Sequence, residues 1–287
     1  MSTSELTLTG GRVLPRRRTG PRLLRSELRL VLRRRRNIAL LVVLACGPVL
    51  LGLAVRASAP NRGEGPPFLS QVTQNGLFLA FTSLVVALPL FLPLAVSVVG
   101  GEAVAGEAST GTLRNLLVVP VGRTRLLAVK YAGIVTYATV CVFVVALMGV
   151  VVGLALFPAG PVTLLSGSTI TFGQALLRAL LVALYVSAML AGVGAIGLFI
   201  STLTEVPMGA MAATAVLTVL CEIADSIPQI SWVHPYLFTH WWTTFGDLLR
   251  SPVPTDGLGR GLMTAGVYVV LFLSLAWARF TTRDVTS

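Results

Sequence analysis

The chain has 287 residues, of which 55% are apolar and only 11% are charged, and its mean hydropathy is +0.85. An average soluble domain carries about twice that charged fraction, so a water-soluble globular protein is excluded and a lipid bilayer is the expected solvent. The net charge of +11 is concentrated before Asn37, where 11 arginines lie. Next to an apolar segment, such a basic end predicts contact with anionic lipid and not with nucleic acid.

The N-terminal region begins with residues 1–20, which we expect to be a flexible basic tail. Residues 21–36 follow with the sequence "PRLLRSELRLVLRRRR", in which arginine recurs every three or four residues. At about 100° per residue these arginines form one stripe, and Leu24, Leu28 and Val31 point the other way. The pattern predicts an amphipathic elbow helix on the inner membrane surface. Its expected role is to anchor the topology, and contact with a cytoplasmic partner is compatible with that role.

Residues 37–280 are expected to form an all-α polytopic membrane domain with six transmembrane helices, because a bilayer core of roughly 30 Å takes about 20 helical residues. The predicted spans are residues 38–55, 77–99, 126–157, 175–201, 206–227 and 261–280. The third is too long for the bilayer at about 1.5 Å per residue. Its first turns, which include Lys130, are therefore expected to project into water.

The orientation follows from the positions of lysine and arginine. With the N-terminus inside, 17 of the 22 basic residues lie in inner segments or at the inner ends of spans. Both termini are therefore predicted to be cytoplasmic, with residues 281–287 as a C-terminal tail. The sequence Ala57-Ser58-Ala59 resembles a signal-peptidase site, but the apolar run before it is longer than that of a signal peptide, so we expect no cleavage.

The sequence contains no recognisable enzyme motif. It has no Gly-x4-Gly-Lys-Ser/Thr phosphate loop, no His-Glu-x-x-His zinc helix and no Gly-x-Ser-x-Gly nucleophile elbow. His234 and His240 are six residues apart in "HPYLFTHWWTTFGDLL", which places them on different faces of a helix. Without a clear third ligand, no metal site is expected there. Trp241 and Trp242 indicate that this stretch forms short helices at the outer membrane surface.

Four residues are candidates for lining a translocation path. Pro89 and Pro93 lie inside the second span, where proline removes a helical hydrogen bond and kinks the helix. Glu222 and Asp225 are three residues apart near the outer end of the fifth span, so they share a helix face. These carboxylates are expected to be hydrated at the interface. Lining the outer part of a substrate path is the alternative, since charge in a membrane is costly and often functional.

A polar stretch, "GEASTGTLRNLLVVPVGRTRLLAVK" (residues 106–130), interrupts the apolar runs on the inner side. Thr112 suits the N-cap of a short helix, Leu113, Leu116 and Leu117 form one apolar stripe, and Pro120 ends the helix. A helix of two turns is not stable alone in water. It must lie against the bilayer, its own bundle or the groove of a partner protein.

This stretch resembles the inner-loop signature of ABC type-2 permeases, the membrane subunits of one class of ATP-driven transporters. The signature runs Gly-Glu-x3-Gly-Thr-Leu-x6-Pro-Val-x-Arg-x6-Lys. The chain meets it, with every spacing kept, at Gly106, Glu107, Gly111, Thr112, Leu113, Pro120, Val121, Arg123 and Lys130. Six spans, the basic elbow helix and the outer segment before the last span also look like that family.

The resemblance implies a coupling helix at residues 112–119 that sits in a groove on a separate cytoplasmic ATPase. Leu113, Leu116 and Leu117 would be its docking contacts, Arg114 and Arg123 would pair with ATPase carboxylates or lipid phosphates, and Glu107 would brace the loop against Arg123. ATP and magnesium would be bound by the partner, and no cofactor by this chain. Two permease copies, identical or related, would join two ATPases in a bacterial cell membrane and work as an exporter.

Three other functions stay open from the sequence. An ion-gradient-driven secondary transporter would need carboxylates near the bilayer middle and often two related halves, and no internal repeat is visible. An intramembrane enzyme would need Glu222, Asp225 and the histidines to converge around a pocket. A membrane anchor for a cytoplasmic protein would not need the proline-kinked second span. The sequence does not identify the substrate.

Overall fold

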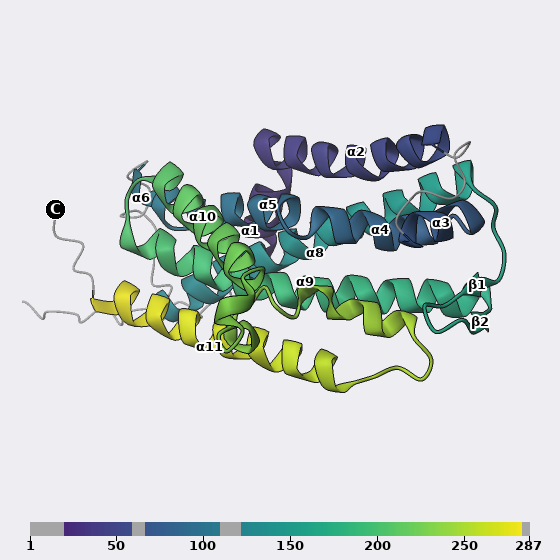
Figure 1. Cartoon of the computed structure of the whole chain (residues 1–287). Coiled ribbons are helices and arrows are strands. Elements are labelled where there is room, and N and C mark those ends of the chain that lie inside the picture. Colours follow the sequence, from purple (N-terminus) through teal and green to yellow (C-terminus); the bar gives the residue numbers. More distant parts are fainter. Residues whose placement is uncertain (1–19, 59–66, 110–121, 283–287) are drawn as a thin grey trace, which may run out of the picture.

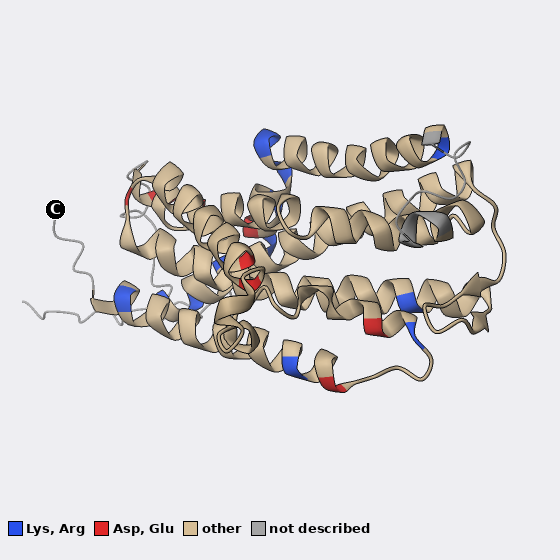
Figure 2. Ribbon diagram, viewed as in Figure 1, with Lys and Arg blue, Asp and Glu red and all other residues tan. Residues whose placement is uncertain are grey.

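The computed structural model describes residues 20–58, 67–109 and 122–282, and these form a bundle of long apolar helices. Five helices are long and apolar enough to cross a membrane, and a bent pair of helices brings the number to six when the pair is taken as one span. Charged residues occupy few turns of these helices (Figure 2). The chain is therefore an all-α, multi-pass membrane protein.

The first half of the chain begins with α1 (Gly20–Arg33), followed directly by α2 (Arg35–Ser58). The short α3 (Pro67–Gln74) leads into the bent pair α4 (Phe78–Ala87) and α5 (Phe91–Glu102). After one turn of helix, α6 (Ala105–Ser109), the described chain resumes at Gly122 and enters the longest helix, α8 (Arg123–Leu156).

The second half begins with a two-residue hairpin, β1 (Val162–Thr163) paired antiparallel with β2 (Thr169–Ile170). Three long helices follow: α9 (Phe172–Leu203), α10 (Pro207–Asp225) and α11 (Asp256–Thr282). The segment between α10 and α11 contains the 3-10 helices η1 (Pro228–Ile230), η2 (His234–Tyr236) and η3 (Trp242–Leu249). Figure 1 shows α6 and the end of α11 at one end of the bundle and the β hairpin at the other.

The second span is broken as its prolines predict. α4 and α5 meet at an angle of 55°, and the break covers Leu88–Leu90, which includes Pro89. Pro93 falls in the first turn of α5, where the missing amide hydrogen costs least. Ser97 Oγ donates to the Pro93 carbonyl at 2.7 Å.

The helix α9 forms the centre of the bundle. In its most apolar 18-residue window 72% of the residues are buried, against 33% or less in the other four long helices. Its first turn is fixed by a capping box in which Thr171 and Gln174 exchange hydrogen bonds. The backbones of α4 and α8 also pack closely, since a Cβ on Gly149 would lie 2.5 Å from the Ala80 Cα.

The helix α1 packs against the bundle on one face. Val31 is buried, and Asn37 Nδ2 donates to the Val31 carbonyl at 2.8 Å, which ties the end of α1 to the start of α2. Tyr137 Oη of α8 donates to the Asn37 carbonyl at 3.0 Å. Together with the ion pair between Glu27 of α1 and Lys130 of α8, these contacts attach α1 and the start of α2 to α8. That this end faces the cytoplasm stays a prediction from the basic residues.

At the start of the third span, the prediction of a water-exposed Lys130 was wrong, while the projection of the first turns beyond the bilayer stays a prediction. Lys130 was expected to project into water, but its side chain is 3% exposed, and Leu126 and Leu127 beside it are also buried. The reason is tertiary: α1 packs against this part of α8 and covers it. The helices α3 and α6 and the hairpin were not predicted.

Candidate functional site

The candidate site is the set of polar contacts at the base of residues 110–121, the segment predicted to contain the coupling helix. Seven of the predicted coupling residues lie outside the described residues: Gly111, Thr112, Leu113, Arg114, Leu116, Leu117 and Pro120. The other two, Glu107 and Arg123, lie on either side of the segment and are both held by contacts to other helices. These contacts define what the segment is attached to.

Lys130 joins three helices at this base. Its Nζ lies 2.5 Å from Glu107 Oε1 of α6 and 3.6 Å from Glu27 Oε1 of α1. Although the lysine is buried, each carboxylate keeps about a fifth of its surface exposed. A buried ammonium is tolerated only when paired. The contact between Glu107 and Lys130 therefore joins α6 to α8, the two helices on either side of residues 110–121.

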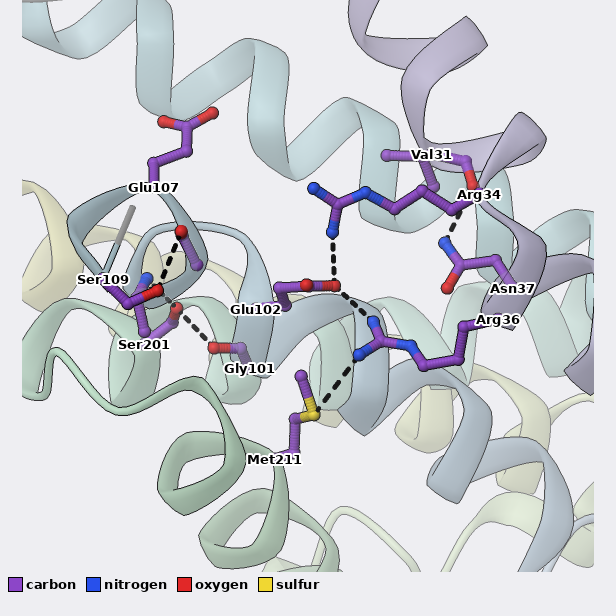
Figure 3. A network of polar contacts seen from close by, with 12 residues as sticks. Val31, Arg34, Arg36, Asn37, Gly101, Glu102, Glu107, Ser109, Ser201 and Met211 are labelled. Carbon is purple, nitrogen blue, oxygen red and sulfur yellow. Dashed lines mark hydrogen bonds and ion pairs between the residues drawn. The ribbon is translucent and has the colours of Figure 1, made fainter. Parts of the chain in front are cut away.

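Glu102, at the end of α5, makes a second set of ion pairs with the junction of α1 and α2. Figure 3 shows Arg34 and Arg36 converging on its carboxylate, with Arg34 Nη1 2.6 Å from Glu102 Oε2. Arg36 also donates to Met211 Sδ of α10 at 3.9 Å. Because these arginines are more than 40% exposed, water screens the pairs and each contributes little stability alone. Their effect is to position α1 and α2 against α5.

Ser201 of α9 fixes the turn between α5 and α6. Its Oγ accepts from the backbone amides of Val104 at 3.0 Å and Ala105 at 2.9 Å, and it donates to the Gly101 carbonyl at 2.7 Å (Figure 3). The side chain is fully buried. One hydroxyl thus satisfies three backbone groups that the end of a helix leaves without partners. A Cβ on Gly101 would lie 2.5 Å from the Met211 amide nitrogen, so α10 packs directly on this turn.

Arg123 attaches the start of α8 to the end of α11. Its Nη1 donates to the carbonyls of Thr281 at 2.8 Å and Phe280 at 3.3 Å, where a cation is favoured by the helix dipole. Trp277 Nε1 donates to Thr124 Oγ1 at 2.9 Å beside it. The prediction that Glu107 braces against Arg123 was therefore wrong. Glu107 forms an ion pair with Lys130 in the region that α1 covers. Arg123 instead donates to the last carbonyls of α11.

The network has balanced charge and little free space. Its ionic side chains are Arg34, Arg36, Lys130, Glu27, Glu102 and Glu107. Three cations and three carboxylates therefore offset each other among these described residues. A cavity of about 30 Å³ lies between α1, α5 and α8, enough for one or two water molecules. Ion pairs with water-sized gaps suit a joint between helices better than a catalytic pocket.

The candidates for a translocation path have different surroundings. Pro89 is exposed on the bundle surface, while Pro93 is buried. Glu222 and Asp225 are half-buried on the last turns of α10. A path through these four residues stays a prediction.

Asp225 and the two histidines, which the sequence analysis grouped only within the enzyme alternative, form a cluster. His240 Nδ1 is 2.6 Å from Asp225 Oδ1, and His234 Nδ1 is 3.9 Å from the same oxygen. The two rings were expected on different faces of a helix, but the chain turns through η2 and brings their centroids to 5.8 Å. The expectation of no third ligand was also wrong, since Asp225 supplies one. Pro228 and Pro235, which begin η1 and η2, are the sequence signal that helical spacing does not hold here.

A comparison with known proteins gives one family. A family model described as "Protein of unknown function (DUF2705)" matches residues 55–286. No curated protein matches the chain.

Proposed function

The chain belongs to the DUF2705 family, and we propose that it is the permease subunit of an ATP-binding cassette transporter that couples to a separate ATPase through residues 106–130. The observation that carries the proposal is the complete inner-loop signature together with its anchoring. Two signature residues, Glu107 and Lys130, form an ion pair, and a third, Arg123, holds α11. Three residues of the signature thus make contacts that tie α6, α8 and α11 together.

The anchoring supports a coupling role for physical reasons. A segment that transmits force must be connected firmly to the elements that move. Both ends of residues 110–121 meet this condition: Glu107 and Lys130 connect them to α1, and Arg123 connects them to α11. Ser201 and Glu102 extend the connection to α9, α5 and α2. A displacement of the segment would therefore move most of the bundle and not only a loop.

The bend between α4 and α5 supplies a place where such a displacement could change the shape of a path. α5 carries Glu102 at one end and meets α4 at 55° at the other. A break in the hydrogen-bond ladder lets the two halves of a span move separately. In the proposed cycle, closure of the ATPases pushes the coupling segment and tilts α5, and the path alternates between inward-closed and outward-open states.

The proposed assembly has two permease copies, identical or related, and two ATPases, in a bacterial cell membrane. ATP and magnesium bind to the ATPases, and this chain binds no cofactor for transport. Export is the proposed direction. The few charges on the spans favour an amphipathic or lipid-like cargo over a highly charged one.

The test is co-purification of the chain with candidate ATPases, beginning with one encoded beside it. We expect a stable complex, and we expect loss of that complex when Leu113, Leu116 and Leu117 are all changed to Asp, because three carboxylates cannot enter an apolar groove. The control changes Asn115 and Val118 to Asp, which adds charge off the leucine stripe and should leave binding intact. Absence of binding to any candidate ATPase, or a complex that survives the triple change, would contradict the coupling assignment.

A further inference from the structure

A polar cluster of Asp225, His234 and His240 lies where α10 ends and the 3-10 segment begins. We propose that these three residues form a binding site for a divalent transition-metal ion, with zinc as the best match. Each residue offers one ligand atom, and the three atoms lie within 4.8 Å of one another. The site is independent of the coupling region, so it stands whether or not the chain works with an ATPase.

The distances are close to those of a tetrahedral zinc site. With zinc-to-ligand bonds of about 2.0–2.1 Å, two ligand atoms of a tetrahedron lie about 3.3 Å apart. From Asp225 Oδ1 the Nδ1 atoms of His240 and His234 lie at 2.6 Å and 3.9 Å, one on each side of that value. Small rotations of the two imidazoles bring both to a common ion. A fourth, open position would be taken by water.

The hydrogen bonds of His234 leave a lone pair facing the carboxylate. Its Nε2 lies 3.1 Å from the Ile227 carbonyl oxygen. A carbonyl only accepts, so Nε2 carries the ring hydrogen and Nδ1 of the neutral ring does not. Nδ1 and Asp225 Oδ1 are then two acceptors 3.9 Å apart, and a cation placed between them would bind both. The bond to a backbone carbonyl is also the usual second contact of a metal-binding histidine.

His240 binds the ion after one rearrangement. Without metal its Nδ1 donates to Asp225, because the ionised carboxylate only accepts. On binding, the ring hydrogen moves from Nδ1 to Nε2, and the Nδ1 lone pair takes the metal. No proton is lost from the neutral ring, and the two-plus charge of the ion is partly offset by Asp225.

Aromatic hydrogen bonds hold the segment that carries the histidines. Trp241 Nε1 donates to the Pro235 carbonyl at 3.1 Å, Tyr268 Oη of α11 donates to the Tyr236 carbonyl at 3.0 Å, and Tyr185 Oη of α9 donates to the Trp241 carbonyl at 2.8 Å. The two histidines are therefore placed by contacts that do not involve the ion. Such preorganisation lowers the entropy cost of binding.

The ligand set selects for transition metals. Two imidazoles with one carboxylate suit zinc and its neighbours, while calcium and magnesium prefer oxygen ligands alone. The three side chains are 16–32% exposed, so an ion can enter from solvent. A bound ion would clamp the segment with His234 and His240 to the last turn of α10.

The experiment uses the full chain in detergent, purified with a tag that contains no histidine and stripped of metal with a chelator. At about pH 8, zinc is titrated in competition with a chromophoric chelator, and bound zinc is counted by elemental analysis. We expect one zinc per chain. Asp225→Asn, His234→Gln and His240→Gln should each weaken binding about tenfold or more.

The matched control is Asp247→Asn. Asp247 lies in the same segment, and its exposed fraction of 25% is almost that of Asp225 at 24%, but it is not part of the cluster. Its zinc affinity should equal that of the unchanged chain. Size-exclusion profiles of all variants show that they remain folded. If the unchanged chain takes up no zinc, the cluster is a simple His–Asp pair and the proposal is overturned. Equal zinc affinity in all variants would also overturn it, because the zinc would then be bound by cysteines or elsewhere.

Discussion

Replacing Lys130 with methionine is expected to lower the free energy of unfolding by about 3 kcal/mol and to abolish communication between residues 110–121 and the bundle. Methionine fills a similar volume but leaves Glu107 and Glu27 without their common cation. Two partly buried carboxylates would then repel each other across the space that the ammonium occupied. Denaturant titration in detergent micelles measures the stability, and stimulation of the ATPase in the proposed complex measures the communication.

The matched control for this change is Arg125→Met, which removes a cation from the same helix at an exposed position. Surface substitutions of this kind usually change stability by less than about 0.5 kcal/mol. A loss of similar size in both variants would show that Lys130 matters only for net charge. A second comparison combines Lys130→Met with Glu107→Gln. If the two groups act as a pair, the double variant should be more stable than the sum of the single effects predicts.

Replacing Ser201 with alanine is the second large effect that we expect, a loss of about 2–3 kcal/mol in unfolding free energy. The change removes the acceptor of the Val104 and Ala105 amides and the donor to the Gly101 carbonyl at a site that water does not reach. The turn between α5 and α6 would loosen, and Glu107 with it. Thermal melting of the purified protein and hydrogen exchange at residues 104 and 105 measure the result.

Ser187→Ala provides the comparison on the same helix. Ser187 is also buried in α9, but its hydroxyl donates only to the Ala183 carbonyl within the helix, which can accept its normal helical bond as well. Its loss should be nearly neutral. If Ser201→Ala melts at the same temperature as Ser187→Ala, the hydroxyl does not hold the turn and the proposed route from α5 to α9 fails.

The long helices could be predicted because each depends on local composition. Apolar runs of sufficient length give α2, α8, α9, α10 and α11 within a few residues, and Pro89 placed the break in the second span. The short elements α3 and α6 carry no such signal. They form because neighbouring helices supply partners, as Ser201 does for the Val104 and Ala105 amides.

The partners of charged residues could not be predicted, for a related reason. Glu107 was assigned to Arg123, since both lie near residues 110–121, but it pairs with Lys130. The choice depends on where α1 lies, and the amphipathic pattern of α1 indicates only that it has one apolar face. Asp225 and His240 are likewise 15 residues apart, and only the turns after Pro228 bring them together.

The contact between Arg123 and the end of α11 has a consequence for biosynthesis. Phe280 and Thr281 follow Arg123 by 157 and 158 residues in the chain. The ribosome therefore delivers Arg123 to the membrane long before Phe280 and Thr281 are made. We expect a nascent or truncated chain to present residues 110–121 with one anchor missing. In the proposed transporter, recruitment of the ATPase would then wait for the last helix, and the order of synthesis would keep incomplete chains out of the assembly.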